Sequence, residues 1–276
     1  MKDDLGVLMK KYEKADCGGV VFSGERPILA RLDGKAFHAW TKHMGLDRPF
    51  DTNLDNARRR STLALMGESG AVVGHCQSDE ISLVWHYPDP KSQPYMGGKL
   101  QKLVSVLASY LTVQFNAQFA SGPYAIFDCR VWEVPTLDDA VQYVSWRQAD
   151  AYRNAVTMAA QCHYSHSELL NKNTDTKLAM LAAKHITQAD FPDRFWYGSL
   201  FVRETRVGKF SPDEIENLPP MHNARRNPDL EVTRSVITEK NFGNVLFLDS
   251  PVGALFNNWQ DSPNRLGTKK GEVHYD

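Results

Sequence analysis

The order in which strands and helices follow one another between residues 28 and 134 limits the fold of this chain more than any other feature. Short apolar runs predict four strands, and longer runs with helical spacing predict two helices. The order is strand, helix, strand, strand, helix, strand, over Ile28–Asp33, Asp51–Met66, Ala71–Cys76, Ile81–Trp85, Lys99–Phe119 and Tyr124–Val134. This βαββαβ order is typical of a ferredoxin-like unit. We therefore predict an α+β palm, an antiparallel sheet with helices packed on it.

The chain beyond residue 135 has more segments with helical spacing than the part before it. This difference predicts a division into a palm-like core with an N-terminal helix (1–135) and a helical extension with C-terminal strands and a tail (136–276). We expect the two parts to pack as one unit.

Local signals give the bounds of several elements. Asp51 can cap the first palm helix, and Asp4–Lys14 is amphipathic enough for a short helix. Ser145 to Gln148 has the form of a capping box, which predicts a helix that starts there. Further predictions are a helix capped by Thr174 or Asp175 and strands over Gly198–Val202 and Glu231–Thr238.

Composition excludes several classes of protein. Of 276 residues, 42% are hydrophobic and 24% charged, which is ordinary for a globular chain. The net charge of −1 means that any nucleic-acid binding depends on local patches. The four cysteines form no Cys-x-x-Cys pair, and no run approaches the ~18 apolar residues of a membrane span. We therefore expect a cytoplasmic, soluble protein with free thiols and no membrane partner.

Two acidic stretches carry the functional signal. Asp33 ends the first strand and precedes Gly34, while Asp79 and Glu80 lie in the bend between the second and third strands. If the first strand pairs with this hairpin, the carboxylates can converge. Mg²⁺ is commonly held by one or two carboxylates together with phosphate and water. Each stretch taken alone is more often a solvated turn, but the two together indicate a nucleotide-handling enzyme.

Four stretches resemble, in order, the motifs of the tRNA-histidine guanylyltransferases and their 3′–5′ polymerase relatives. They are Arg31-Leu32-Asp33-Gly34-Lys35-Ala36-Phe37-His38, Gln77-Ser78-Asp79-Glu80, Phe127-Asp128-Cys129-Arg130 and Ser145-Trp146-Arg147-Gln148-Ala149-Asp150. The resemblance covers roughly residues 28 to 155 and fades after about residue 160.

The resemblance implies a nucleotidyltransferase that adds GTP or another nucleoside triphosphate to the 5′ end of tRNA or another RNA, in the 3′–5′ direction. In the family, ATP first activates the 5′-monophosphate as an adenylylated end, and the 3′-hydroxyl of GTP then displaces AMP. Two Mg²⁺ ions can neutralise the attacking and leaving oxygens of such displacements. The resemblance also implies a homo-oligomer, a tetramer.

The resemblance assigns roles to named residues. Asp33, the Gly34 carbonyl and Asp79 correspond to metal ligands, and Glu80 to a residue that supports them. The loop from Asp33 to His38, which contains Lys35, Ala36 and Phe37, is implied to bind the triphosphate together with Ser78. Glycine suits this loop because it has no Cβ to block a phosphate. His38 is implied to contact phosphate, or it is simply a histidine at a helix end.

Two departures from the family pattern concern function. The family commonly has lysine where this chain has Arg48, although the following nucleotide-site residue, Asp51, is retained. A planar guanidinium and a compact ammonium present different geometries to the activation step. The family's His-Ile-Asn-Asn stretch on the tRNA-facing helix is here Tyr152-Arg153-Asn154-Ala155. This chain therefore resembles a divergent member, such as a bacteriophage one, whose RNA can differ from tRNA-histidine.

Other interpretations stay open at this point. A nucleotide cyclase or dinucleotide synthase also places acidic residues at a palm hairpin, and an RNA-binding domain without catalysis can share the fold. His163 and His166 are more consistent with a helix surface than with a metal site. The run Arg58-Arg59-Arg60 is read as a solvated face, or as a contact to a phosphate backbone.

Overall fold

A six-stranded antiparallel sheet organises the computed structural model, which describes residues 7–12, 19–241 and 243–257. The strand order is β4-β1-β3-β2-β5-β6. The strands are β1 (Ile28–Gly34), β2 (Val73–Gln77), β3 (Glu80–Trp85), β4 (Phe127–Glu133), β5 (Ser199–Lys209) and β6 (Glu231–Lys240). The first four strands, with α3 (Thr52–Ser69) and α4 (Leu100–Asn116), have the predicted βαββαβ order, so the predicted α+β palm is confirmed.

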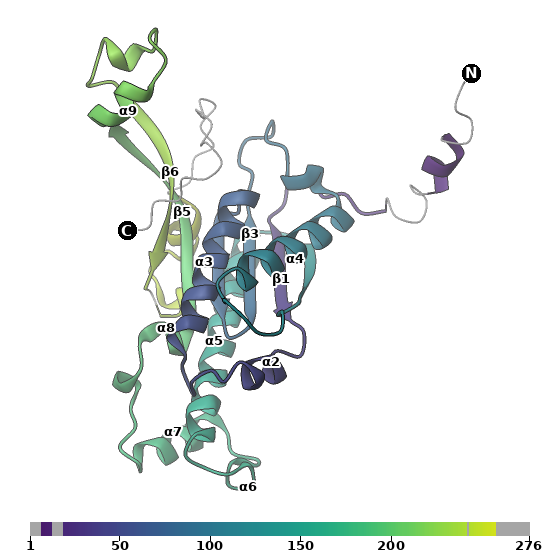
Figure 1. Cartoon of the computed structure of the whole chain (residues 1–276), viewed down its shortest axis with the longest axis vertical. Coiled ribbons are helices and arrows are strands. Elements are labelled where there is room, and N and C mark those ends of the chain that lie inside the picture. Colours follow the sequence, from purple (N-terminus) through teal and green to yellow (C-terminus); the bar gives the residue numbers. More distant parts are fainter. Residues whose placement is uncertain (1–6, 13–18, 242, 258–276) are drawn as a thin grey trace.

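Helices cover both faces of the sheet (Figure 1). On one face, α3 and α4 bury Leu65, Leu107 and Phe115 in a core with the alternate β1 residues that include Ala30 and Leu32. On the other face, α5 (Leu137–Gln161) packs Val141 and Val144 against sheet residues such as Leu29, Val84 and Leu200. Because successive strand residues point to opposite faces, β1 is apolar toward α3 and α4 and carries Arg31 and Asp33 toward α5.

Local sequence signals explain the first palm helix. The Asp51 side chain caps α3 by accepting a hydrogen bond from the Leu54 amide at 2.8 Å, and Gly70 ends the helix with φ of 73°. Left-handed backbone of this kind is the usual helix C-terminus at glycine. Both signals lie within a few residues of the helix that they bound, which is why the sequence predicts them.

The predicted helix start at Ser145 is wrong. The helix α5 begins at Leu137, where Thr136 and Asp139 form the capping box through reciprocal hydrogen bonds. Ser145 lies inside the helix, and its hydroxyl donates to the Asn244 side chain at 2.7 Å. The Ser-x-x-Gln pattern resembles a cap, but the residue that caps α5 is Thr136.

Helices α6 (His166–Leu169), α7 (Thr174–Ala182) and α8 (Asp193–Tyr197) lie near the C-terminal end of α5, whereas α2 (Phe37–His43) packs in the core with α4. A third core joins the C-terminal half of α5 to Leu181 of α7 and Trp196 of α8. Asn173 caps α7, in place of the predicted Thr174 or Asp175. Helix α9 (Pro212–Asn217) lies between β5 and β6 in the chain, and helical turns lie at Tyr95–Gly98, Gln188–Asp190, Asn223–Arg225, Val245–Phe247 and Gly253–Asn257.

The C-terminal strands belong to the same sheet as the palm. Residues Ser199 to Val202 of β5 pair with β2, and the rest of β5 pairs with β6 alone. The β5–β6 hairpin therefore extends beyond the palm and carries α9 at its end (Figure 1). The boundary at residue 135 stays a prediction.

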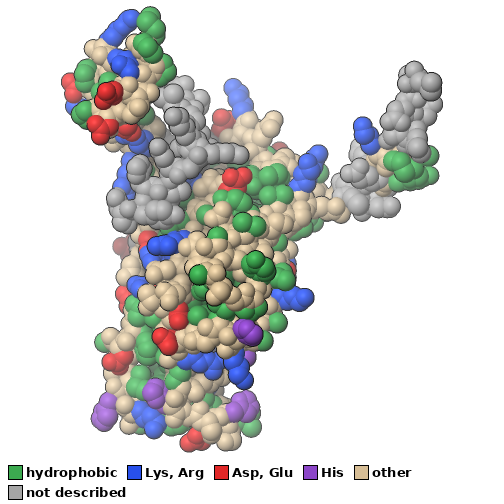
Figure 2. Space-filling view, in the orientation of Figure 1, with side chains coloured by type: hydrophobic (Ala, Val, Ile, Leu, Met, Phe, Trp, Pro, Cys, Tyr) green, Lys and Arg blue, Asp and Glu red, His purple; other side chains and the backbone are tan. Residues whose placement is uncertain are grey.

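The structure also bears on the predictions for the chain ends, the cysteines and the surface charge. Residues 7–12 are helical, while the rest of the predicted Asp4–Lys14 helix and the tail after residue 257 lie outside the described residues. Cys76, Cys129 and Cys162 are free thiols. Within the described ranges, no helix is long and apolar enough to cross a membrane. Figure 2 shows Lys and Arg side chains spread over several parts of one face rather than covering it.

We expect Thr136→Ala to lower the free energy of unfolding by about 0.5–2 kcal/mol, because the first-turn amide of α5 loses its acceptor. Thr136→Ser keeps the hydroxyl and should stay close to the parent protein. Urea unfolding followed by circular dichroism measures both. Equal losses in the two variants would contradict the capping role.

Candidate active site

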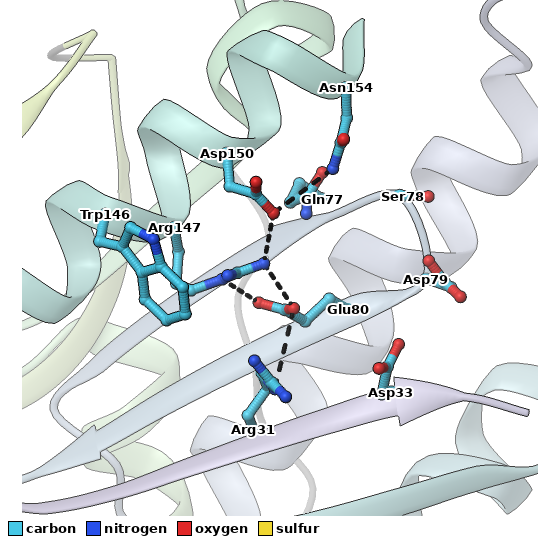
Figure 3. Close-up of a pocket in the computed structure, with 10 residues that line it drawn as sticks. All are labelled: Arg31, Asp33, Gln77, Ser78, Asp79, Glu80, Trp146, Arg147, Asp150 and Asn154. Carbon is cyan, nitrogen blue, oxygen red and sulfur yellow. Dashed lines mark hydrogen bonds and ion pairs between the residues drawn. The ribbon is translucent and has the colours of Figure 1, made fainter. Parts of the chain in front are cut away.

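Asp33 and Asp79 lie beside each other at the end of β1 and in the β2–β3 turn. A Cβ built on Gly34 would stand 3.0 Å from the Asp79 Cβ and 2.5 Å from a Phe37 ring carbon. Position 34 therefore needs glycine so that the hairpin tip can approach the end of β1. The sequence analysis expects a glycine here because a side chain would block a phosphate. In the structure, the space that a side chain would need is taken by Asp79 and Phe37. Figure 3 shows both carboxylates at the same end of the pocket.

The electrostatics of this pair are unfavourable without a cation. Burial raises the pKa of Asp79, and the nearby Asp33 carboxylate raises it further, although the Ser78 hydroxyl and Arg58 act in the opposite direction. Desolvation and a like charge both disfavour an ionised carboxylate. The arrangement therefore favours a positive charge between the two groups.

Glu80 contacts Arg147 and Ser82 rather than the two aspartates. Arg147 of α5 donates to both of its carboxylate oxygens, from Nε at 2.6 Å and from Nη2 at 2.7 Å. The Ser82 hydroxyl donates to Oε1 at 3.3 Å and also contacts the Tyr143 hydroxyl at 2.8 Å. Burial raises the pKa of Glu80, while the charge of Arg147 opposes that rise. In the structure Glu80 holds Arg147 rather than turning to Asp33 and Asp79.

The loop after Asp33 offers only part of the triphosphate contacts that the sequence predicts. The Lys35 amide donates to the Ile126 carbonyl at 2.8 Å, so this amide is not available to a phosphate. The Phe37 ring is buried and stacks on Trp40 with centroids 4.9 Å apart. Ala36 has φ of 51°, and the amides of residues 36–38 donate no hydrogen bond to another described residue. These three amides are the part of the loop that can meet an anion.

His38 and Arg48 are exposed and Asp51 is half-buried, and these three residues do not line the cavity beside Asp33 and Asp79. Arg48 Nη2 stands 3.2 Å from His38 Nδ1, so these two predicted catalytic residues contact each other. Asp51 caps α3 with one oxygen and accepts from the Asp47 amide at 3.0 Å with the other. The Asp51 side chain therefore stabilises the start of α3 and the loop before it.

Two arginines contribute to the site in ways that the sequence did not predict. Arg58, read as part of a solvated face, is buried; it pairs with Asp55 and donates to the Ser78 carbonyl at 3.3 Å. Asp55 also pairs with Arg194 of α8 at 2.6 Å. The three-residue spacing of Asp55 and Arg58 on a helix was the available signal. The second is Arg147, which lies in the matched motif but has no predicted role.

A cavity of about 340 Å³ lies between α5 and the ends of β1, β2 and β3. Among the described residues, no group of three or more His, Cys, Asp or Glu side chains could hold a metal ion by itself. Asp33 and Asp79 nevertheless offer carboxylate oxygens, the ligand type that suits Mg²⁺, which commonly takes its other ligands from phosphate and water. The cavity is lined by Arg31, Asp33, Gln77, Ser78, Asp79, Glu80, Trp146, Arg147, Asp150 and Asn154.

Comparison with known proteins agrees with this arrangement. Residues 7–135 match the family model of tRNAHis guanylyltransferase, Thg1. A bacterial tRNA(His) guanylyltransferase (Thg1)-like protein, solved in complex with ATP, is 33% identical; the match covers 72% of this chain and 88% of that chain, with a TM-score of 0.67. A bacterial Thg1-like protein in complex with GTP is 27% identical, with coverages of 86% and 91% and a TM-score of 0.62.

A curated relative gives the same family over a shorter match. The tRNA(His) guanylyltransferase of Schizosaccharomyces pombe is 30% identical over 155 residues, which are 53% of this chain and 56% of that protein. The fold and the comparisons together define a nucleotidyltransferase. More closely, the chain belongs to the tRNAHis guanylyltransferase (Thg1) family.

We expect Arg147→Met to lower the free energy of unfolding by about 3–5 kcal/mol, because Glu80 is left buried without its partner. The double variant Glu80→Leu/Arg147→Met should recover much of that loss, since neither charge then remains buried. Chemical denaturation of the parent protein, both variants and Glu80→Leu gives a double-mutant cycle for the pair. Additive losses would show that the two side chains are not coupled.

We expect Asp79→Asn to increase stability at pH 7. A carboxyl group whose pKa is higher in the folded than in the unfolded protein binds more protons when folded, so stability falls as pH rises from near 3.8 through the folded pKa. Asparagine removes this penalty, and its advantage should shrink in acid, where Asp79 is neutral. Thermal unfolding between pH 3.5 and 8 measures the effect. Asp249→Asn, at an exposed carboxylate away from the cavity, is the control and should stay within about 0.5 kcal/mol.

Proposed function

We propose that this protein adds a nucleotide to the 5′ end of a tRNA or a similar RNA in the 3′–5′ direction, with Mg²⁺, ATP and GTP. The observation that carries the proposal is the close approach of Asp33 and Asp79 at one end of a cavity, in a chain of this family. Relatives solved in complex with ATP and with GTP support nucleoside triphosphates as substrates.

Two chemical steps are proposed. An oxygen of the RNA 5′-monophosphate attacks the α-phosphorus of ATP, and pyrophosphate leaves. The 3′-hydroxyl of GTP then attacks the RNA 5′-phosphorus, loses its proton, and AMP leaves. Both steps are displacements at phosphorus, where catalysis depends mainly on positioning and on neutralising negative charge.

The residues of the site divide this work. Asp33, the Gly34 carbonyl and Asp79 would hold Mg²⁺, which when bound neutralises charge on the phosphate oxygens. The free amides of residues 36–38 can donate to a triphosphate, and His38 with Arg48 lies where further phosphate contacts are possible. Glu80 is a positioning residue in this proposal, because it acts through Arg147.

The residues of the site do not determine which RNA is used or how the protein assembles. The change from His-Ile-Asn-Asn to Tyr152-Arg153-Asn154-Ala155 supports an RNA other than tRNA-histidine, or a broader choice. The cytoplasmic location, the tetramer, the second Mg²⁺ ion and the role of Asp51 in nucleotide binding stay predictions.

The test is extension of a 5′-monophosphorylated tRNA by labelled GTP in the presence of ATP and Mg²⁺. We expect a product one or more nucleotides longer, no product after chelation of Mg²⁺, and at least a roughly 100-fold loss of kcat/KM in Asp33→Asn and Asp79→Asn. Asp249→Asn, at an exposed carboxylate outside the cavity lining, is the matched control and should retain most activity.

Two outcomes would count against the proposal. The first is absence of extension on a panel of tRNAs by folded protein. The second is formation of cyclic or linear dinucleotides from triphosphates without RNA, which would favour the cyclase or synthase alternative.

A further inference from the structure

The cavity has an aromatic wall to which neither of the two steps assigns a role. Trp146 of α5 lines the cavity and is 50% exposed, although large aromatic side chains usually bury most of their surface. The Arg147 guanidinium lies 4.4 Å from the centre of the indole ring. Because Glu80 holds that guanidinium, the indole is fixed from one side while half of its surface stays open.

Trp146 begins a column of cavity-lining residues on α5. Trp146, Asp150 and Asn154 are spaced by four residues, so they lie on one face of the helix over about 12 Å. Figure 3 shows this face turned toward the sheet, with Trp146 at one end and Asn154 near the hairpin tip. The column thus presents a flat ring followed by a carboxylate and an amide.

The indole and the acidic pair lie at opposite ends of the cavity. Figure 3 shows Trp146 on the side of Arg31, and Asp33 and Asp79 on the other side. The amides of residues 36–38 follow Asp33 in the chain, and these three residues do not line the cavity. A triphosphate held by those amides and by Asp33 leaves the Trp146 end free for the other substrate. Arg31 and Arg147 also line the cavity, and both pair with Glu80.

We propose that Trp146 is the stacking platform for the terminal base of the RNA acceptor. This inference rests on the proposed function, because it assigns one end of the same cavity to the RNA. Proteins recognise unpaired RNA ends by stacking bases on aromatic side chains, and such stacking tolerates any base. An indole backed by a guanidinium is rigid, so little side-chain freedom is lost when a base stacks on it. The platform therefore binds an RNA end without selecting its sequence.

The experiment measures binding without turnover. The probe is a 5′-monophosphorylated RNA hairpin with one unpaired 5′ nucleotide, compared with the same hairpin whose 5′-terminal nucleotide is abasic. Fluorescence anisotropy at fixed salt gives Kd for both probes with the parent protein, Trp146→Ala, Trp146→Phe and Tyr124→Ala. Tyr124 is an exposed aromatic residue outside the cavity lining and serves as the matched control.

We expect the parent protein and Tyr124→Ala to bind the intact probe roughly 5- to 150-fold more tightly than the abasic probe, which corresponds to one stacked base. Trp146→Ala should lose this preference by binding the intact probe as weakly as the abasic one, and Trp146→Phe should keep most of it. Kd values for ATP and GTP should not change in Trp146→Ala. Unchanged circular dichroism and Tm show that the variants are folded.

Three results would overturn the inference. Full preference for the intact probe in Trp146→Ala would mean that the base stacks elsewhere. Weaker binding of ATP or GTP with unchanged RNA binding would assign the indole to the nucleotide. Equal Kd values for both probes with the parent protein would exclude a stacked terminal base. Because binding is read directly, failure to extend any RNA would count against the proposed function while leaving a measured base preference intact.

Discussion

The ion pair between Arg147 and Glu80 joins the two layers that form the active-site cavity. It crosses from α5 to β3, and both side chains are almost fully buried. A buried pair of this kind is favourable only when its geometry is good and its other polar atoms are satisfied. Here Arg147 also donates to Asp150, Glu80 also accepts from Ser82, and the Trp146 ring covers the guanidinium. The helix is thereby held over the strand ends by polar contacts, and the cavity can remain open beside them.

The second structural requirement is the close approach of two like charges. Packing of the backbone at Gly34 against Asp79 sets their positions, and Arg58 holds the hairpin tip through the Ser78 carbonyl. Ser78 itself has a left-handed backbone, with φ of 49°. Strained backbone and desolvated carboxylates both lower stability, and such features are commonly kept where function depends on them.

Features with a local cause are the ones that the sequence predicts correctly. The βαββαβ order, the Asp51 cap and the β2–β3 hairpin all depend on residues only a few positions apart. The same reasoning failed at Ser145, because a capping pattern can occur by chance inside a long helix. It also misread Arg58, since a run of three arginines does not reveal which of them turns inward toward Asp55.

The sequence alone therefore determined the order of the elements, the positions of the carboxylates and, through its motifs, the family. Only the tertiary structure decided which carboxylates face each other and which one is paired with an arginine. Glu80 and Arg147 are 67 residues apart, and Asp55 and Arg194 are 139 apart. No propensity, cap or periodicity acts over such distances. Side-chain partners between separate elements are set by the packing of helices on the sheet, which depends on both faces of the whole fold at once.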